Sequence, residues 1–162
     1  MASGVTELQP LNPRVTWLWR LQGLLRLGMV WGPMAIGVGV GLGMLTIAPV
    51  GVVLTLALLV FFFAVAMIWP TLEYEYFRYA IREHDLLVQR GVLFRRRSSI
   101  PHNRIQHVDT RQGPIERFLG LSNVAVYTAS GMSADGSIPG LSASDAESIR
   151  DELARLGGDD GV

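Results

Sequence analysis

The sequence predicts a membrane α-helical hairpin followed by a small α+β domain, in which a bent antiparallel sheet or barrel is capped by a C-terminal helix. Three observations predict this fold class. From Leu27 to Leu72 the chain runs for 46 residues without a charged side chain. Short segments with strand-like alternation and Gly or Pro at their ends follow this run. The last segment, Ser144 to Leu156, has the apolar spacing of an amphipathic helix.

The uncharged run contains two segments of membrane-spanning length. Ala48-Pro49 divides it into Leu27–Ile47 and Val50–Trp69, which as helices rise roughly 31 and 30 Å, close to the hydrocarbon thickness of a bilayer. Trp69-Pro70 is predicted to end the second span. The predicted regions are an N-terminal interfacial segment (1–26), a two-helix transmembrane hairpin (27–71), a domain (72–157) and a frayed tail (158–162).

Arginines that flank the two spans predict the orientation of the chain. Arg14, Arg20 and Arg26 precede the first span, Arg78 and Arg82 follow the second, and the intervening turn is uncharged. Because cytoplasmic flanks are enriched in basic residues, both termini of this multi-pass chain are expected in the cytoplasm. The first run exceeds the apolar core of a signal peptide and a second run follows at once, so we expect it to be retained.

Glycines in the first span have the spacing of a helix-packing face. Three Gly-xxx-Gly spacings allow two helix backbones to approach closely. Their partner is expected to be the second span of the same chain or, alternatively, another subunit or membrane protein. Neither span contains an ionisable residue, which argues against a proton relay or an ion pathway. The candidate packing residues are Gly28, Gly32, Gly37, Gly39, Gly41 and Gly43.

Several short strands are predicted after the second span. Glu73–Ile81 is predicted as the first strand because it is rich in aromatic residues, and Glu83-His84-Asp85 as a polar turn. Gly91 can supply the positive φ of a tight turn, so Leu86–Gln89 and Val92–Ile100 are predicted to form a hairpin through Arg90-Gly91. Arg104–Thr110 is predicted as the next strand.

The end of the chain is predicted to contain two more strands and two helices. Gly113-Pro114 ends the preceding strand, and Ile115–Leu119 is predicted as one helical turn that stops at Gly120. The predicted strands are Ser122–Ala129 and Ser137–Leu141, with a loop at Met132–Gly136 between them. Ser144 and Glu147 have capping-box spacing, and the helix that they open is expected to end at Gly157 and to bury Ala146, Ile149, Leu153 and Leu156.

Charge is distributed unevenly although the formal net charge is zero. Residues 90–117 contain seven arginines and two acids, whereas residues 135–162 contain seven acids and two arginines. The chain has no cysteine, which excludes a disulfide framework, a thiolate metal site and a cysteine nucleophile. The middle of the domain is therefore predicted to be basic and its end acidic.

Long motifs in the predicted domain resemble a known family. The motifs are Ile100-Pro101-His102-Asn103-Arg104-Ile105-Gln106-His107-Val108, Gln112-Gly113-Pro114-Ile115-Glu116-Arg117-Phe118-Leu119-Gly120-Leu121 and Thr128-Ala129-Ser130-Gly131. With the two preceding spans, they resemble the bacterial PH domain of YdbS-like membrane proteins. The resemblance implies a pleckstrin-homology-type barrel at the bacterial inner membrane. It also implies a binding module with no recognised catalytic centre and no cofactor.

An arginine-rich surface is the candidate binding site. Near an anionic leaflet each arginine contributes on the order of 1 kcal/mol, so the group can bind lipid headgroups or an acidic protein partner. A solvated basic strand edge that discourages aggregation is the structural alternative. The first predicted turn, Glu83-His84-Asp85, carries acids, which argues against specific inositol-lipid recognition. The candidate residues are Arg90, Arg95, Arg96, Arg97, Arg104 and Arg111.

A catalytic interpretation rests on few residues. His107 and Asp109 share a strand face and can form a pair, whereas His102 and His107 would point to opposite faces of a regular strand. Ser98 or Ser99 would supply the hydroxyl. No third ligand has suitable spacing for a metal.

We therefore predict a non-catalytic integral membrane protein that presents a cytoplasmic PH-like module for assembly or scaffolding. The expected partners are membrane lipids and other membrane proteins or copies of the same chain, with no nucleic acid and no small-molecule substrate. An accessory subunit that contacts a larger complex through the glycine-rich helix and an electrostatic lipid binder are the alternatives. The remaining alternative is an enzyme that uses His107 and Asp109.

Overall fold

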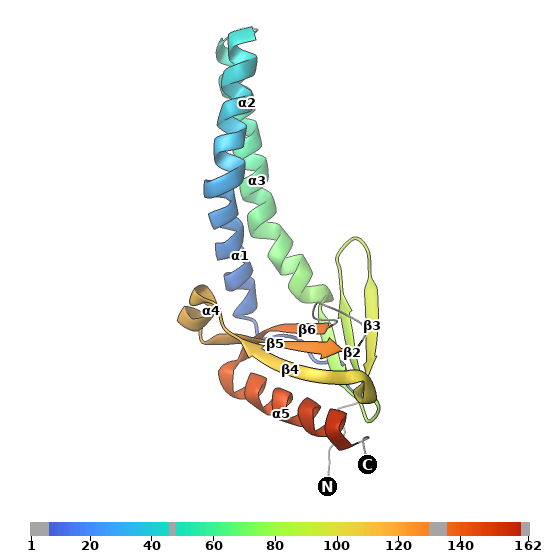
Figure 1. The fold of residues 1–162 in the computed structure, drawn as a ribbon. Coiled ribbons are helices and arrows are strands. Elements are labelled where there is room, and N and C mark those ends of the chain that lie inside the picture. Colours follow the sequence, from blue (N-terminus) through green and yellow to red (C-terminus); the bar gives the residue numbers. More distant parts are fainter. Residues whose placement is uncertain (1–6, 46–47, 130–135, 160–162) are drawn as a thin grey trace. The chain divides into compact units, whose positions relative to one another are not determined.

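The computed structural model describes residues 7–45, 48–129 and 136–159. In chain order the elements are α1 (Val15–Arg26), the π-helical segment η1 (Leu27–Trp31), α2 (Gly32–Leu45), α3 (Ala48–Tyr76), β1 (Arg78–Ile81), β2 (Asp85–Arg90), β3 (Arg96–Pro101), the 3-10 turn η2 (His102–Arg104), β4 (Ile105–Arg111), α4 (Pro114–Leu119), β5 (Leu121–Thr128), β6 (Gly136–Ser142) and α5 (Ala143–Asp159) (Figure 1). Two compact units result: a helical unit over Trp19–Leu72, and a domain that combines the chain up to Leu18 with the chain from Glu73 onward.

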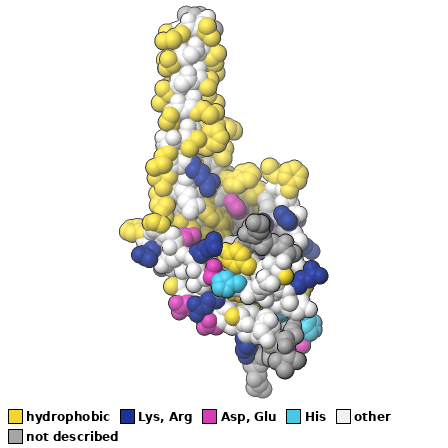
Figure 2. Space-filling view, in the orientation of Figure 1, with side chains coloured by type: hydrophobic (Ala, Val, Ile, Leu, Met, Phe, Trp, Pro, Cys, Tyr) yellow, Lys and Arg dark blue, Asp and Glu magenta, His cyan; other side chains and the backbone are white. Residues whose placement is uncertain are grey.

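The helical unit is a pair of long apolar helices. Val15–Leu45 and Ala48–Tyr76 are both long and apolar enough to cross a membrane. Their most apolar stretches are only 11% and 6% buried, so nearly all of this apolar surface faces outward (Figure 2). The core helix of a soluble protein would be mostly buried, which these helices are not, and the predicted pair of long apolar helices is confirmed.

Contacts along the helical unit hold its two helices side by side. The rings of Trp31 and Phe62 stack with centroids 4.8 Å apart. Toward the start of the first helix and the end of the second, Nη2 of Arg20 donates a hydrogen bond to Oγ1 of Thr71 over 3.0 Å. The guanidinium group is thus bound by a polar partner close to the end of the uncharged run.

A π-helical segment interrupts the first helix and was not predicted. The N–H of Gly32 bonds the carbonyl of Leu27, five residues back. Pro33 follows directly, and because it has no N–H it cannot donate to the carbonyl one turn earlier. The wider turn at η1 thus coincides with a residue that cannot complete an ordinary α-helical ladder.

The predicted end of the second helix at Pro70 and the predicted strand from Glu73 are wrong. Pro70 lies inside α3, and the helix continues to Tyr76. The N–H of Phe77 donates to the carbonyl of Glu73 over 3.0 Å. Nη1 of Arg78 donates to the carbonyls of Tyr74 (3.1 Å) and Phe77 (2.6 Å), so this side chain caps the helix end. Only Arg78–Ile81 remains as the first strand.

The domain contains two three-stranded antiparallel sheets, in the orders β1-β2-β3 and β4-β5-β6. α5 packs on β4, β5, β6 and η2. This arrangement confirms the predicted bent antiparallel sheet capped by a C-terminal helix. The core residues with at most 1% exposure include Leu86, Leu121, Val124, Val126, Ile138, Ala146 and Leu153.

The N-terminal segment belongs to the domain and extends its first sheet. Gln9 and Tyr79 exchange two backbone hydrogen bonds, of 2.7 and 3.1 Å. Leu11, Val15 and Leu18 are at most 2% exposed. The predicted boundary at residue 26 therefore differs from the structure, in which the chain joins the helical unit at Trp19.

The hairpin and the 3-10 turn differ in detail from the predicted strands. Gly91 has a φ of +112°, as predicted, but β3 begins only at Arg96, so the connection is longer than a two-residue turn. The predicted strand from Arg104 begins one residue later, because η2 includes Arg104. The predicted stop of α4 at Gly120 is confirmed by a φ of +67°.

The start and the end of α5 also differ from prediction. Oγ of Ser142 accepts a hydrogen bond from the N–H of Asp145 (3.1 Å), so Ser142 is the cap and the capping box predicted at Ser144 is wrong. The helix continues past Gly157 to Asp159. The loop at residues 132–135, the motif residues Ser130 and Gly131, and the end of the tail lie outside the described residues.

Candidate functional site

Two arginines of the predicted surface face each other across the β2–β3 hairpin. Arg90 and Arg96 are directly opposite in the strand register, and both are exposed. Among the described residues, neither forms an ion pair. Like charges in this position repel each other and destabilise the pairing of the strands. An anionic partner between them would relieve this repulsion.

Arg95 and Arg97 lie beside this pair but have different surroundings. The guanidinium carbon of Arg95 is 5.2 Å from the centroid of the Tyr76 ring, at the end of α3. Arg97 pairs in register with Gln89 and thus lies on the opposite sheet face from Arg96. The structure therefore brings Arg90, Arg95, Arg96 and Arg97 to one hairpin, although not onto one face.

The other two predicted arginines lie elsewhere in the domain. Arg104 is in η2, which follows the far end of β3 from Arg96. Arg111 ends β4 in the second sheet, where its Nη2 donates to the hydroxyl of Tyr127 and lies 3.7 Å from Oδ2 of Asp109. One continuous surface of six arginines does not form.

Within the described residues, no strand pairs with the outer edge of β3. β3 has β2 as its one strand neighbour within the described residues, whereas Gln9 covers the β1 edge of the same sheet. The N–H of His102 donates to the carbonyl of His84. In an antiparallel pair, the backbone bonds to the neighbouring strand recur at every second residue. The peptide groups of Arg97 and Ser99 therefore point away from β2, toward the outer side of β3. Pro101 occupies the next such position, where its missing N–H costs no ladder bond.

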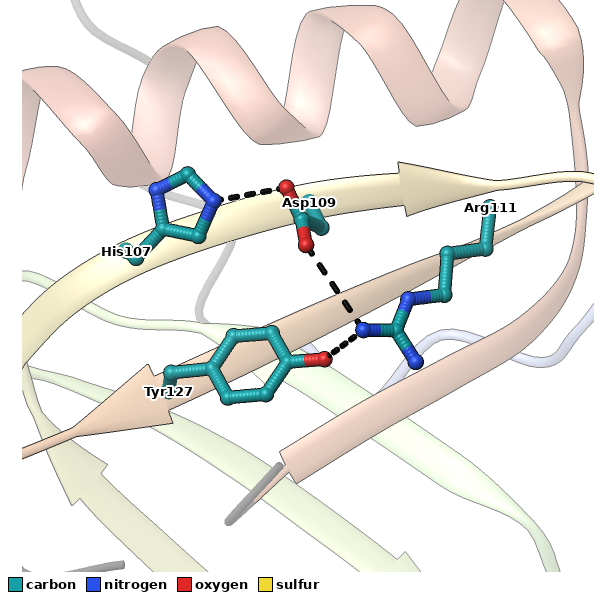
Figure 3. Close-up of polar contacts among 4 residues, drawn as sticks. All are labelled: His107, Asp109, Arg111 and Tyr127. Atoms are coloured by element: carbon teal, nitrogen blue, oxygen red, sulfur yellow. Dashed lines mark hydrogen bonds and ion pairs between the residues drawn. The ribbon is translucent and has the colours of Figure 1, made fainter. Parts of the chain in front are cut away.

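The predicted pair on β4 forms. Nε2 of His107 is 2.7 Å from Oδ1 of Asp109, and Figure 3 shows this pair continuing through Arg111 to Tyr127. All four side chains come from the neighbouring strands β4 and β5. The His107 and Asp109 side chains are 66% and 39% exposed, so the pair lies at the surface, where ion pairs stabilise little.

The remaining members of the catalytic hypothesis do not join this pair. His102 is 2% exposed, and its Nε2 lies 2.8 Å from the carbonyl oxygen of Arg82. Oγ of Ser99 donates to Oδ2 of Asp85, on β2. Among the described residues, no group of three His, Cys, Asp or Glu side chains can hold a metal ion.

A hollow of about 430 Å³ lies between the N-terminal segment and α5. Tyr79 lines it together with Gln9 and Asp145. Burial raises the pKa of the Tyr79 hydroxyl above its ordinary value of 10, and the negative charge of Asp145 raises it further. This tyrosine is therefore held in its neutral form.

The candidate packing glycines divide into two groups. A Cβ atom on Gly39 would collide with Thr55 and the backbone of Gly51, and one on Gly43 would lie 3.5 Å from the Cα of Gly51. These two glycines thus pack against α3. Gly32 is confined by the carbonyl of Leu27 in its own helix. A Cβ atom on Gly28, Gly37 or Gly41 would meet nothing within 4 Å.

Exposed apolar side chains of the domain were missed by the sequence analysis. Leu93 and Phe94, at the end of the β2–β3 hairpin, are 75% and 88% exposed, and Phe118 of α4 is 86% exposed. The segment Val92-Leu93-Phe94 directly before three arginines was the available signal. The predicted strand Val92–Ile100 includes these residues, and the alternation of a strand would bury half of them.

Comparison with known proteins identifies the family. Two antiparallel sheets with α5 packed on them, preceded by two long apolar helices, are the architecture of a PH-like domain. The family model described as "Bacterial PH domain" matches residues 33–157, and the chain belongs to this family.

A curated relative supports this assignment. The UPF0699 transmembrane protein YdbS of Bacillus subtilis (strain 168) is 36% identical over 87 residues, which are 54% of this chain and 53% of the relative. The chain thus spans about half the length of this relative. Among solved structures, a DUF1696 family protein with a pleckstrin-homology domain from Shewanella loihica PV-4 is 12% identical with a TM-score of 0.40, over 50% of this chain and 70% of that one.

Proposed function

We propose that this PH-domain membrane protein is a non-catalytic scaffold, whose domain holds a partner protein at the cytoplasmic face of the bacterial inner membrane. The observation that carries this proposal is the outer edge of β3, which has no strand partner within the described residues. An extended segment of a partner can add to such an edge as a further strand, because the backbone groups of the edge strand are available for hydrogen bonding.

Charge defines the chemistry of the partner. Arg97 is exposed and, among the described residues, forms no ion pair, and its peptide group faces the outer side of β3. An extended segment that carries Asp or Glu would gain both strand hydrogen bonds and a charge-assisted contact. The proposed partner is therefore a protein with an acidic extended segment, which can be a different membrane protein or a second copy of this chain.

The orientation in the membrane supports the same proposal. Two membrane-crossing helices would bring the beginning and the end of the described chain to one side of the bilayer, and the flanking arginines favour the cytoplasmic side. The positions of the hydroxyl and imidazole groups argue against a serine hydrolase, since Ser99 is hydrogen-bonded to Asp85 on β2, whereas His107 and Asp109 lie on β4 of the other sheet.

Photocrosslinking in native membranes tests the scaffold. A photoreactive amino acid replaces Gln89, which lies opposite Arg97, in the full-length chain. The same amino acid at Gln106, an exposed residue of β4, is the matched control. We expect one discrete protein adduct at Gln89, weaker adducts at Gln106, and loss of the Gln89 adduct in Arg97→Glu and Arg97→Pro.

The two variants separate charge from backbone hydrogen bonding. Arg97→Glu reverses the charge, whereas Arg97→Pro removes the outward N–H and the charge together. Arg97→Gln serves as a neutral variant that keeps the N–H. Adducts with lipid alone, or a protein adduct unaffected by both Arg97→Glu and Arg97→Pro, would contradict binding of a protein at this edge.

The outward glycines favour a second candidate, an accessory subunit of a larger membrane complex. Gly37 and Gly41 are one turn apart, and neither is used against α3. Close approach of a partner helix at this face would be blocked by Gly41→Leu. If a stoichiometric partner is lost from detergent extracts of Gly41→Leu but retained with Arg97→Glu, the accessory-subunit function replaces the scaffold.

A further inference from the structure

The end of the β2–β3 hairpin exposes two adjacent apolar side chains. Leu93 and Phe94 are 75% and 88% exposed, within a connection that begins at Gly91. Figure 2 shows hydrophobic side chains on the surface of the domain as well as on the helices. Solvated turns normally carry Gly, Asn, Asp, Ser or Pro, so an exposed Leu-Phe pair favours contact with an apolar phase.

The same hairpin is tied to the end of a membrane-spanning helix. Tyr76 is the last residue of α3 and follows Leu72, the end of the uncharged run, by four residues, a rise of about 6 Å. The guanidinium group of Arg95 lies over the Tyr76 ring, and Phe94 directly precedes Arg95. The apolar tip is therefore attached close to the point where the chain leaves the bilayer.

Basic residues follow the apolar tip on both strands. Arg90 ends β2, Arg96 begins β3, and the two are opposite each other without an ion pair among the described residues. An anionic headgroup between them would relieve the repulsion between like charges. Apolar residues at a tip and paired arginines at its base match the order of layers in a bilayer, from acyl chains to phosphate.

We propose that the β2–β3 hairpin is a second membrane-binding site, in which Leu93 and Phe94 enter the acyl region and Arg90 and Arg96 bind the phosphates of anionic lipids. The occupant is the lipid surface to which the chain is already anchored. The hairpin then restrains the rotation of the domain about its helical tether. This site goes beyond the proposed scaffold, because it requires no protein partner and uses the opposite sheet face from Arg97.

Spin labels in the full-length chain test this site. The chain has no cysteine, so Phe94→Cys and Leu93→Cys each carry a single nitroxide. The chain is placed at one copy per nanodisc, in a mixture of phosphatidylglycerol and phosphatidylcholine. Gln106→Cys, exposed on β4, is the control. We expect several-fold lower accessibility to a water-soluble nickel complex, and higher accessibility to oxygen, at Phe94 and Leu93 than at Gln106.

The arginine pair is tested separately. Arg90→Gln with Arg96→Gln is expected to raise nickel accessibility at position 94, as is replacement of phosphatidylglycerol by phosphatidylcholine. Equal nickel accessibility at positions 94 and 106 would overturn the proposal. Protection of position 94 only in nanodiscs that contain two copies would also overturn it, by assigning the tip to a protein contact. The Gln89 crosslink reports on the scaffold independently.

Discussion

Arg95 places its guanidinium carbon 5.2 Å from the centre of the Tyr76 ring, and thereby joins the hairpin to the end of α3. Cation–π contacts at exposed sites contribute about 0.5–1 kcal/mol. We expect Arg95→Gln and Tyr76→Leu each to lower the unfolding free energy, with a coupling energy of about 0.5–1 kcal/mol in a double-mutant cycle. Urea denaturation of the full chain in detergent measures it, and additive effects would contradict the contact.

Gly140 and Gly120 form a matched pair for a prediction about backbone conformation. Both have positive φ, +66° and +67°, but a Cβ atom on Gly140 would collide with the buried Val15, whereas one on Gly120 would meet nothing within 4 Å. We expect Gly120→Ala to cost about 1–2 kcal/mol of unfolding free energy and Gly140→Ala about 2–4 kcal/mol. Thermal or urea unfolding in detergent compares them. Equal losses would mean that Val15 does not pack against Gly140.

Gly39 and Gly41 test the division of the glycine face. We expect Gly39→Leu to destabilise the helical unit, since its side chain would displace Thr55 and the Gly51 backbone, and Gly41→Leu to leave the stability of the isolated chain unchanged. Thermal stability in detergent is the measurement. A larger loss for Gly41→Leu would contradict the packing of α2 on α3 through Gly39.

Tyr79 predicts a loss of stability at alkaline pH. Because burial and Asp145 raise the pKa of Tyr79 above 10 in the folded chain, its contribution is complete below pH 10 and is lost as the pH rises through the folded value. We expect the unfolding free energy of Tyr79→Phe to fall less steeply above pH 10 than that of the unchanged chain. Tyr74→Phe is the control, and identical slopes for Tyr79→Phe and the unchanged chain would refute this assignment.

His107 and Asp109 test the catalytic alternative. As an exposed pair they are expected to contribute less than about 1 kcal/mol, so His107→Ala and Asp109→Asn should fold normally. Under the scaffold proposal both variants also retain the crosslink at Gln89. A variant with normal folding and expression that loses a cellular phenotype, while the crosslink persists, would instead favour catalysis.

The sequence predicts the elements whose signals are local. The uncharged run determines the helical pair, and Gly91 and Gly120 supply the positive φ values at which the chain turns. Alternation on β5 and the apolar face of α5 similarly require only neighbouring residues. These helices, turns and strands depend on short-range sterics and on burial of neighbouring residues, so the sequence alone is enough to predict them.

Tertiary contacts explain what was not predictable. Arg78 caps the carbonyls of Tyr74 and Phe77, so the helix continues through aromatic residues that alone favour a strand. Gln9 joins β1 through a bridge that spans seventy residues of sequence. The division of the arginines likewise depends on sheet register, since Arg90 and Arg96 become opposite only once the hairpin connection has its full length.

Accessibility of a single cysteine in intact cells tests the central claim, that two spans hold the PH-like domain on the cytoplasmic side. Gln106→Cys provides an exposed thiol in a chain that otherwise has none. A membrane-impermeant maleimide is predicted to label it only after the cells are permeabilised. Equal labelling in intact and permeabilised cells would place the domain outside and contradict the account.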